Sequence, residues 1–115
     1  MDKIKEFKEE RLRLNEIVLK YSDQEIKRFF SLDNQVYRDD KLSSATKEML
    51  GLVASLVLRC DDCIKYHLIQ CYESGISIEE IEEVLSVGLI VGGSITIPHI
   101  RRAFEFWENL IQNAK

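Results

Sequence analysis

Two cysteines and a histidine lie close together in the segment RCDDCIKYHL: Cys60, Cys63 and His67. If this segment is helical, the spacings of three and four residues place all three side chains on one face. A Cys-x-x-Cys pair closes a small disulfide readily, and a histidine one turn away can accept or return the proton of a thiol. The pattern therefore predicts thiol redox chemistry.

A thiol with an ordinary pKa of about 8.5 needs help to become the reactive thiolate near neutral pH. A helix that starts at Cys60 would favour the thiolate by about 0.3 to 1 kcal/mol, but Asp61 and Asp62 would oppose it. We therefore expect His67 to act as the general base. Glu48, the acidic residue that begins a long apolar run, is expected to orient the imidazole. The second cysteine is nearer the base and the first nearer the helix start, so the order of attack stays open.

Three other interpretations of these residues remain. The cysteines could be buried small hydrophobic residues of a non-catalytic protein, or could bind zinc together with His67 and Glu48, because these ligand types suit a tetrahedral ion. The third is an acid–base enzyme, such as a lactone decarboxylase, that uses His67 and Glu48 without sulfur chemistry. Outside this group we expect Cys71 to serve packing. We expect a structural or interface role for His99, because no spacing places it near Cys60.

The composition indicates one soluble globular domain over residues 1–115, with 45% hydrophobic and 31% charged residues. The net charge of −4 is spread over all segments without a basic patch, so we expect no nucleic-acid partner. The longest apolar runs are shorter than a membrane span and the N-terminus carries no export signal, so we expect a cytoplasmic protein without membrane contact. Three cysteines, an odd number, argue against a structural disulfide framework.

The periodicity of the apolar residues predicts an all-α fold. The expected helices cover residues 3–20, 22–32, 44–59, 61–75, 77–91 and a last stretch that begins between 94 and 97 and ends near 112. Two capping boxes, Ser22 with Glu25 and Ser77 with Glu80, mark the starts of the second and fifth helices. The segment 33–41 is expected to be a loop, and the helix over 44–59 should be the central buried element because it is apolar on nearly every side.

The series Glu48, Cys60, Cys63 and His67 resembles the motif of the AhpD-like alkylhydroperoxidase branch of the carboxymuconolactone decarboxylase family. The segment KLSSATKEMLGLVASLVLRCDDCIKYHL is similar to the core of that family, GISIEEIEEVL to its following helix and VGGSITIPHIRRA to its glycine-bearing junction. The short, single-domain members are the most similar. One difference is Asp62, because better-known AhpD proteins carry a histidine at this position.

The resemblance implies an AhpD-like helical domain of about six helices that assembles as a homotrimer or homohexamer. It also implies a redox-active Cys60–Cys63 pair and a proton relay formed by Glu48 and His67. The substrates would be hydroperoxides or the disulfide of a partner, and a thiol or dithiol donor would restore the reduced pair, with neither a cofactor nor a metal. Family members that decarboxylate lactones lack the cysteine pair, so the family name does not fix the reaction.

Overall fold

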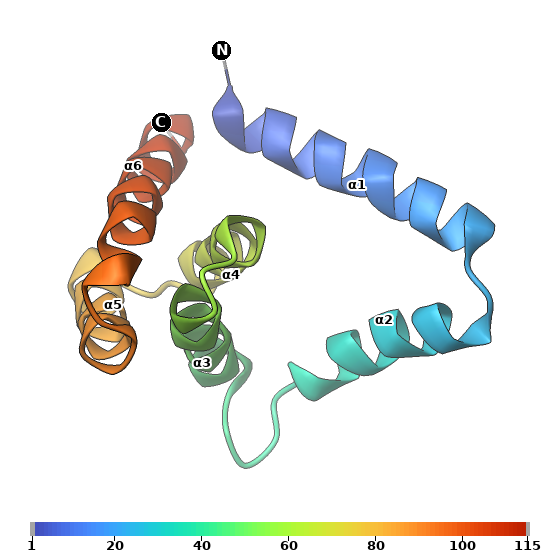
Figure 1. The fold of residues 1–115 in the computed structure, drawn as a ribbon, viewed down its shortest axis with the longest axis horizontal. Helices are drawn as coiled ribbons and strands as arrows, with labels where there is room; N and C mark the ends of the chain where they lie inside the picture. Colours follow the sequence, from blue (N-terminus) through green and yellow to red (C-terminus); the bar gives the residue numbers. More distant parts are fainter. Residues whose placement is uncertain (1, 115) are drawn as a thin grey trace.

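The computed structural model describes residues 2–114 and contains, within them, six α-helices and no strand (Figure 1). The all-α fold that the sequence predicts is therefore confirmed. The helices are α1 (Lys3–Tyr21), α2 (Gln24–Val36), α3 (Ser44–Val57), α4 (Asp61–Glu73), α5 (Ile78–Gly92) and α6 (Ile97–Asn113), and a short 3-10 turn, η1 (Ser94–Thr96), precedes α6. Over the same residues, none of these helices combines the length and the apolar character needed to cross a bilayer.

Polar side chains cap α3 and α5 at the positions where the sequence predicts that these two helices begin. The hydroxyl of Ser43 accepts a hydrogen bond from the Thr46 backbone N–H at the start of α3. The capping box of Ser77 and Glu80 is formed at the start of α5, with both reciprocal hydrogen bonds present. Each cap satisfies backbone N–H groups that have no partner inside the helix, and this fixes the residue at which the helix begins.

The prediction for α2 was wrong at both ends. Asp23, and not Ser22, is the N-cap, because its carboxylate accepts a hydrogen bond from the next backbone N–H while the Ser22 hydroxyl donates to a carbonyl of α1. The helix also continues to Val36 rather than ending near Leu32. The expected loop over 33–41 contains neither glycine nor proline in its first half, and an exposed helix tolerates the polar residues found there.

The core lies between α3, α4, α5 and α6, with α3 packed against both α4 and α5. Helix α3 buries only the face that contains Leu52 and Leu56, and Leu50 on its other side is about half exposed. The expectation that this helix is the central element is therefore confirmed by its packing against α4 and α5, but within this chain it is not buried all round. The other large core side chains are Ile64, Leu68, Ile69, Ile81, Leu85, Phe106, Trp107 and Leu110.

Helices α1 and α2 form an N-terminal arm, Lys3–Val36, that extends away from the four-helix core (Figure 1). The arm is attached near its start, where Ile4 is buried and the ring of Phe7 meets Phe106 of α6 edge-on, with 5.7 Å between ring centroids. The rest of α1 carries exposed apolar side chains, and α2 buries none of its thirteen residues. The arm therefore presents a large apolar surface outside the core of its own chain.

Candidate active site

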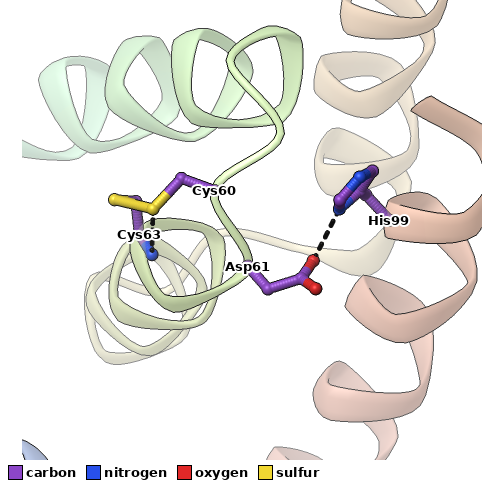
Figure 2. Close-up of a disulfide and its surroundings, with 4 residues drawn as sticks. All are labelled: Cys60, Asp61, Cys63 and His99. Atoms are coloured by element: carbon purple, nitrogen blue, oxygen red, sulfur yellow. Dashed lines mark hydrogen bonds and ion pairs between the residues drawn. A yellow bond between two sulfur atoms is a disulfide. The ribbon is translucent and has the colours of Figure 1, made fainter. Parts of the chain in front are cut away.

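Cys60 and Cys63 form a disulfide at the start of α4 (Figure 2). Cys60 is the N-cap of α4, and its Sγ lies 3.2 Å from the Cys63 backbone N–H, which donates to it. The two Cα atoms are 5.3 Å apart, a separation that disulfides commonly span. Cys60 is partly buried and Cys63 is exposed, so the second sulfur is the more accessible to a molecule from solution.

The turn between α3 and α4 delivers Cys60 to this position. Its backbone follows a Schellman motif, in which the Arg59 N–H donates to the Leu56 carbonyl and the Cys60 N–H to the Ser55 carbonyl. Arg59 adopts the left-handed conformation, with φ of 60°, in which glycine is usually found. The turn that ends α3 therefore leads directly into Cys60, the N-cap of α4. Helix α3 itself ends at Val57, two residues earlier than predicted.

Glu48 and His67 lie in direct contact between α3 and α4. The imidazole Nδ1–H donates to Glu48 Oε1 over 2.8 Å, and the two residues are only 4% and 8% exposed. A buried carboxylate requires such a partner, because desolvation without compensation would be costly. The two residues that the sequence analysis paired are thus brought together, while their catalytic roles stay predictions.

Aromatic rings and a glycine hold the imidazole in place. The rings of Tyr37 and Tyr66 lie 5.5 and 5.4 Å from His67 between centroids. A Cβ atom at Gly51 would lie 2.6 Å from His67 Cε1 and 2.8 Å from both His67 Nε2 and the Tyr37 hydroxyl. Gly51 therefore allows the histidine and the tyrosine to lie directly against the backbone of α3. Neither Gly51 nor Tyr37 was predicted as a site residue, although an isolated glycine inside a helical pattern often signals close packing.

Burial and the Glu48 charge keep the neighbouring groups protonated. Burial raises the pKa of the Tyr37 and Tyr66 hydroxyls, and the negative charge of Glu48 raises both further. Burial also raises the pKa of Cys71 to about 12, with a further contribution from Glu48. Cys71 is fully buried in the core and its thiol stays neutral near pH 7, which agrees with the packing role expected for it.

A cavity of about 380 Å³ lies between the arm and α4, and both Cys63 and His67 line it. Phe7 and Leu14 contribute apolar surface, and the Arg11 guanidinium stacks on Tyr66 with 4.1 Å to the ring centroid. The remaining lining residues are Glu10, Asn15, Asp33, Asp62 and Tyr66. The exposed sulfur and the buried imidazole therefore share one solvent-accessible space that can hold a small molecule.

A second polar cluster lies beside the disulfide. Asp61 follows Cys60 and accepts two hydrogen bonds from α6: His99 Nδ1–H donates to Oδ1 over 2.7 Å, and Arg102 Nε–H donates to Oδ2 over 2.9 Å. Figure 2 shows the Asp61 carboxylate turned toward His99 and away from the sulfurs. His99 therefore lies next to the cysteine segment, which no spacing in the sequence indicates, because the contact depends on how α6 packs against α4.

The four residues of the zinc hypothesis do not form a common ligand set. The two sulfurs are bonded to each other, and Glu48 is paired with His67. Nowhere in residues 2–114 are three or more His, Cys, Asp or Glu side chains arranged to hold a metal ion.

Comparison with known families and curated proteins gives two matches. The model of the carboxymuconolactone decarboxylase family matches residues 25–106, a range that contains the cysteine pair, Glu48, His67 and His99. A curated relative, an uncharacterized protein of Cupriavidus necator, is 26% identical over 73 residues. That match covers 64% of this chain and 65% of the relative's length.

Solved structures include close relatives. A Thermotoga maritima protein is 56% identical, and two of its crystal structures match with TM-scores of 0.94, covering 96% of each chain, and 0.89, covering 93% of this chain and 91% of the other. The second is described as a carboxymuconolactone decarboxylase family protein with a suggested part in the antioxidative response. A Legionella pneumophila protein of the same family is 23% identical, with a TM-score of 0.80 and full coverage of both chains, and supports the fold alone.

Proposed function

Because this chain belongs to the carboxymuconolactone decarboxylase family, we propose that it is an AhpD-like thiol oxidoreductase that reduces hydroperoxides or a partner's disulfide. The observation that carries the proposal is the Cys60–Cys63 disulfide at a helix start, with the exposed Cys63 opening into the cavity that His67 also lines. The antioxidative part suggested for the Thermotoga maritima protein supports the same chemistry.

The proposed reaction starts from the reduced protein. His67 accepts the proton of the Cys63 thiol, and the thiolate attacks the terminal oxygen of a hydroperoxide. The S–O bond forms as the O–O bond breaks, and the alcohol leaves with the proton that His67 held. Cys63 is then a sulfenic acid, and the Cys60 thiol attacks its sulfur. The hydroxyl group leaves as water with the Cys60 proton, so two electrons have passed from the cysteine pair to the peroxide.

A dithiol donor completes the cycle by thiol–disulfide exchange. One donor thiolate attacks the Cys60–Cys63 disulfide, and the second donor thiol then releases the mixed disulfide. The donor becomes a disulfide, and both protein sulfurs become thiols again. Exchange in the opposite direction, with a partner's disulfide as the oxidant, uses the same two cysteines and replaces the peroxide step.

In this proposal Glu48 orients His67. Because the Nδ1–H is held by the carboxylate, Nε2 is the nitrogen that can take the thiol proton. The carboxylate also stabilises the imidazolium that forms, and burial of the pair weakens the screening of that attraction by water. Neither the orientation of the imidazole nor the stabilisation of the imidazolium requires a cofactor.

The test is peroxide consumption by the reduced protein with a panel of dithiol donors. We expect turnover in the wild type, its loss in Cys60→Ser and Cys63→Ser, and its retention in Cys71→Ala, the matched control for removing a thiol. Thiol titration before and after one equivalent of peroxide should show the loss of two thiols per chain. Peroxide consumption that survives in the double variant Cys60→Ser, Cys63→Ser would contradict the proposal, because Glu48 and His67 can move protons but supply no electrons.

We also propose that the chain works as a homo-oligomer, a trimer or a hexamer. The supporting observation is α2, a helix of thirteen residues that buries no side chain within its own chain. An isolated helix of this length is marginal in water, so its stability must come from packing. Apolar side chains recur along α2 at helical spacings, and a second copy of the chain would provide a surface of matching character.

A further inference from the structure

The contact of Asp61 with α6 has no part in the proton and sulfur steps described above. It joins the first residue of α4 to His99 and Arg102. Figure 2 shows the Asp61 carboxylate and His99 on the opposite side of the start of α4 from the sulfurs. The Asp61 side chain is about one-third exposed and that of His99 is less exposed, so the contact is partly shielded from water. We refer to Asp61, His99 and Arg102 as the Asp61 clamp.

The clamp changes the charge next to Cys60. A carboxylate close to a sulfur disfavours the thiolate, and two acidic residues separate the cysteines in the sequence. Asp62 is exposed and lines the cavity, but Asp61 is turned away and both of its oxygens accept hydrogen bonds, one of them from a permanent cation. Most of the Asp61 charge is therefore compensated where it stands.

We propose that His99 and Arg102 are positioning residues that neutralise Asp61 and so stabilise the thiolate of the reduced Cys60–Cys63 pair. The inference rests on the proposed function, since it concerns the same two sulfurs. It assigns to α6 an influence on cysteine reactivity that the motif residues on α3 and α4 do not provide.

Two observations support this role. Partial burial alone would raise the pKa of the Asp61 carboxyl, but the hydrogen bonds and charges of His99 and Arg102 outweigh it and hold that pKa below its ordinary value. The clamp also contains no sulfur, so reduction of the disulfide breaks none of its contacts. We therefore expect it to persist in the state in which the thiolate forms.

Other charged groups also face the sulfurs and their cavity. They are Glu10 and Arg11 of α1, Asp33 of α2, Asp62, and His67 with Glu48 bonded behind it. These groups are the same in every variant of the clamp, so a difference between variants reports the clamp itself.

The decisive test compares the two sides of one contact. Asp61→Asn removes the negative charge and leaves the cation, so the thiol pKa of Cys60 should fall by about half a unit. Arg102→Gln leaves the Asp61 carboxylate without its permanent cation, so the same pKa should rise by about half a unit. The double variant should return close to the wild type. The measurement is the pH profile of iodoacetamide alkylation of the reduced protein, followed at each cysteine by mass spectrometry.

A purely structural anchor would behave differently, because both substitutions break the same contact and would move the pKa in the same direction. The proposal is overturned if both variants shift the Cys60 pKa in the same direction. It is also overturned if the shifts are no larger than that of the control Arg101→Gln, which removes an exposed cation one residue away. If Arg102→Gln does not fold, as judged by circular dichroism, His99→Gln takes its place, because it removes the other donor to Asp61. A rise in the Cys60 pKa then supports the proposal, and no change or a fall overturns it. No peroxide is used, so an absence of turnover in the wild type would contradict the proposed function and leave this test valid.

Discussion

The position of the His67 imidazole depends on Gly51, which contributes no side chain. Three atoms of His67 and Tyr37 lie where a Cβ at this position would stand, within 2.6 to 2.8 Å. Such distances are shorter than any normal contact, so even a methyl group must displace the rings. Because His67 is buried and bonded to Glu48, a displaced ring cannot keep its present hydrogen bond.

Gly51→Ala should therefore impair the site more than the fold. Overpacking costs about 1 to 3 kcal/mol, whereas alanine gains about 0.5 to 1 kcal/mol of helix stability over glycine, so a net loss of about 1 kcal/mol is expected. Urea unfolding measures this value, and Ala54→Gly at an exposed position of α3 calibrates the helix contribution. The NMR signal of the His67 Nδ1–H should shift or disappear in Gly51→Ala. An unchanged signal would show that the ring has room for the methyl group.

The sequence predicts some site residues better than others for a physical reason. Cys60, Cys63 and His67 belong to one helix, so their spacing alone places them on one face. The contact of Tyr37 with His67 depends on where the segment after α2 crosses α3, and that of His99 with Asp61 on the packing of α6 against α4. No local pattern reports contacts of this kind.

At the scale of elements, α3 and α4 both end in a Schellman motif, but with different residues in the left-handed position. Gly75 has φ of 83° after α4, and Arg59 has φ of 60° after α3. The Gly75 N–H donates to Tyr72 and the Ile76 N–H to Cys71, in the same pattern as at the end of α3. Gly75 could be predicted as the left-handed residue after α4, because glycine signals this conformation, although the helix ends two residues before it, at Glu73. The end of α3 was predicted late by the same two residues, and there the left-handed residue could not be predicted, because arginine does not signal this conformation.

Opposite substitutions at Arg59 and Gly75 should have opposite effects on the stability of the protein. Arg59→Gly should stabilise the protein by about 1 kcal/mol, because glycine takes a left-handed conformation without the steric cost that an L side chain meets. Gly75→Arg should destabilise it by about the same amount, and a Cβ there has nothing within 4 Å, so the backbone is the only cause. Urea unfolding of both variants measures the effects, with Leu58→Gly, at a right-handed position, as a control that should destabilise. An Arg59→Gly variant no more stable than the wild type would contradict this assignment of strain.

At the scale of the whole molecule, the N-terminal arm is the part whose apolar side chains the rest of the chain leaves exposed. Helix α2 carries Ile26, Phe29, Leu32 and Val36 at spacings of three and four residues, and each is between 47% and 66% exposed. This spacing places them in one stripe, and the cavity at Cys63 is bounded by the same arm. An assembly that packs the stripe would also fix the arm over the cysteine site, so the association of the chain and the shape of the cavity should be coupled.

Phe29→Glu should therefore dissociate the assembly. Burial of a phenylalanine contributes about 1.5 to 3 kcal/mol, so its loss at each contact should weaken association by at least about tenfold, and the new charge should weaken it further. Sedimentation velocity over a range of concentrations should show the wild type well above the 13.4 kDa of one chain and the variant shifted toward that mass. Ser31→Glu places the same charge about 200° around α2, on its polar face, and should leave the mass unchanged. A wild type that sediments as one chain at every concentration would refute the oligomer, and equal effects of the two substitutions would show that the stripe is not its interface.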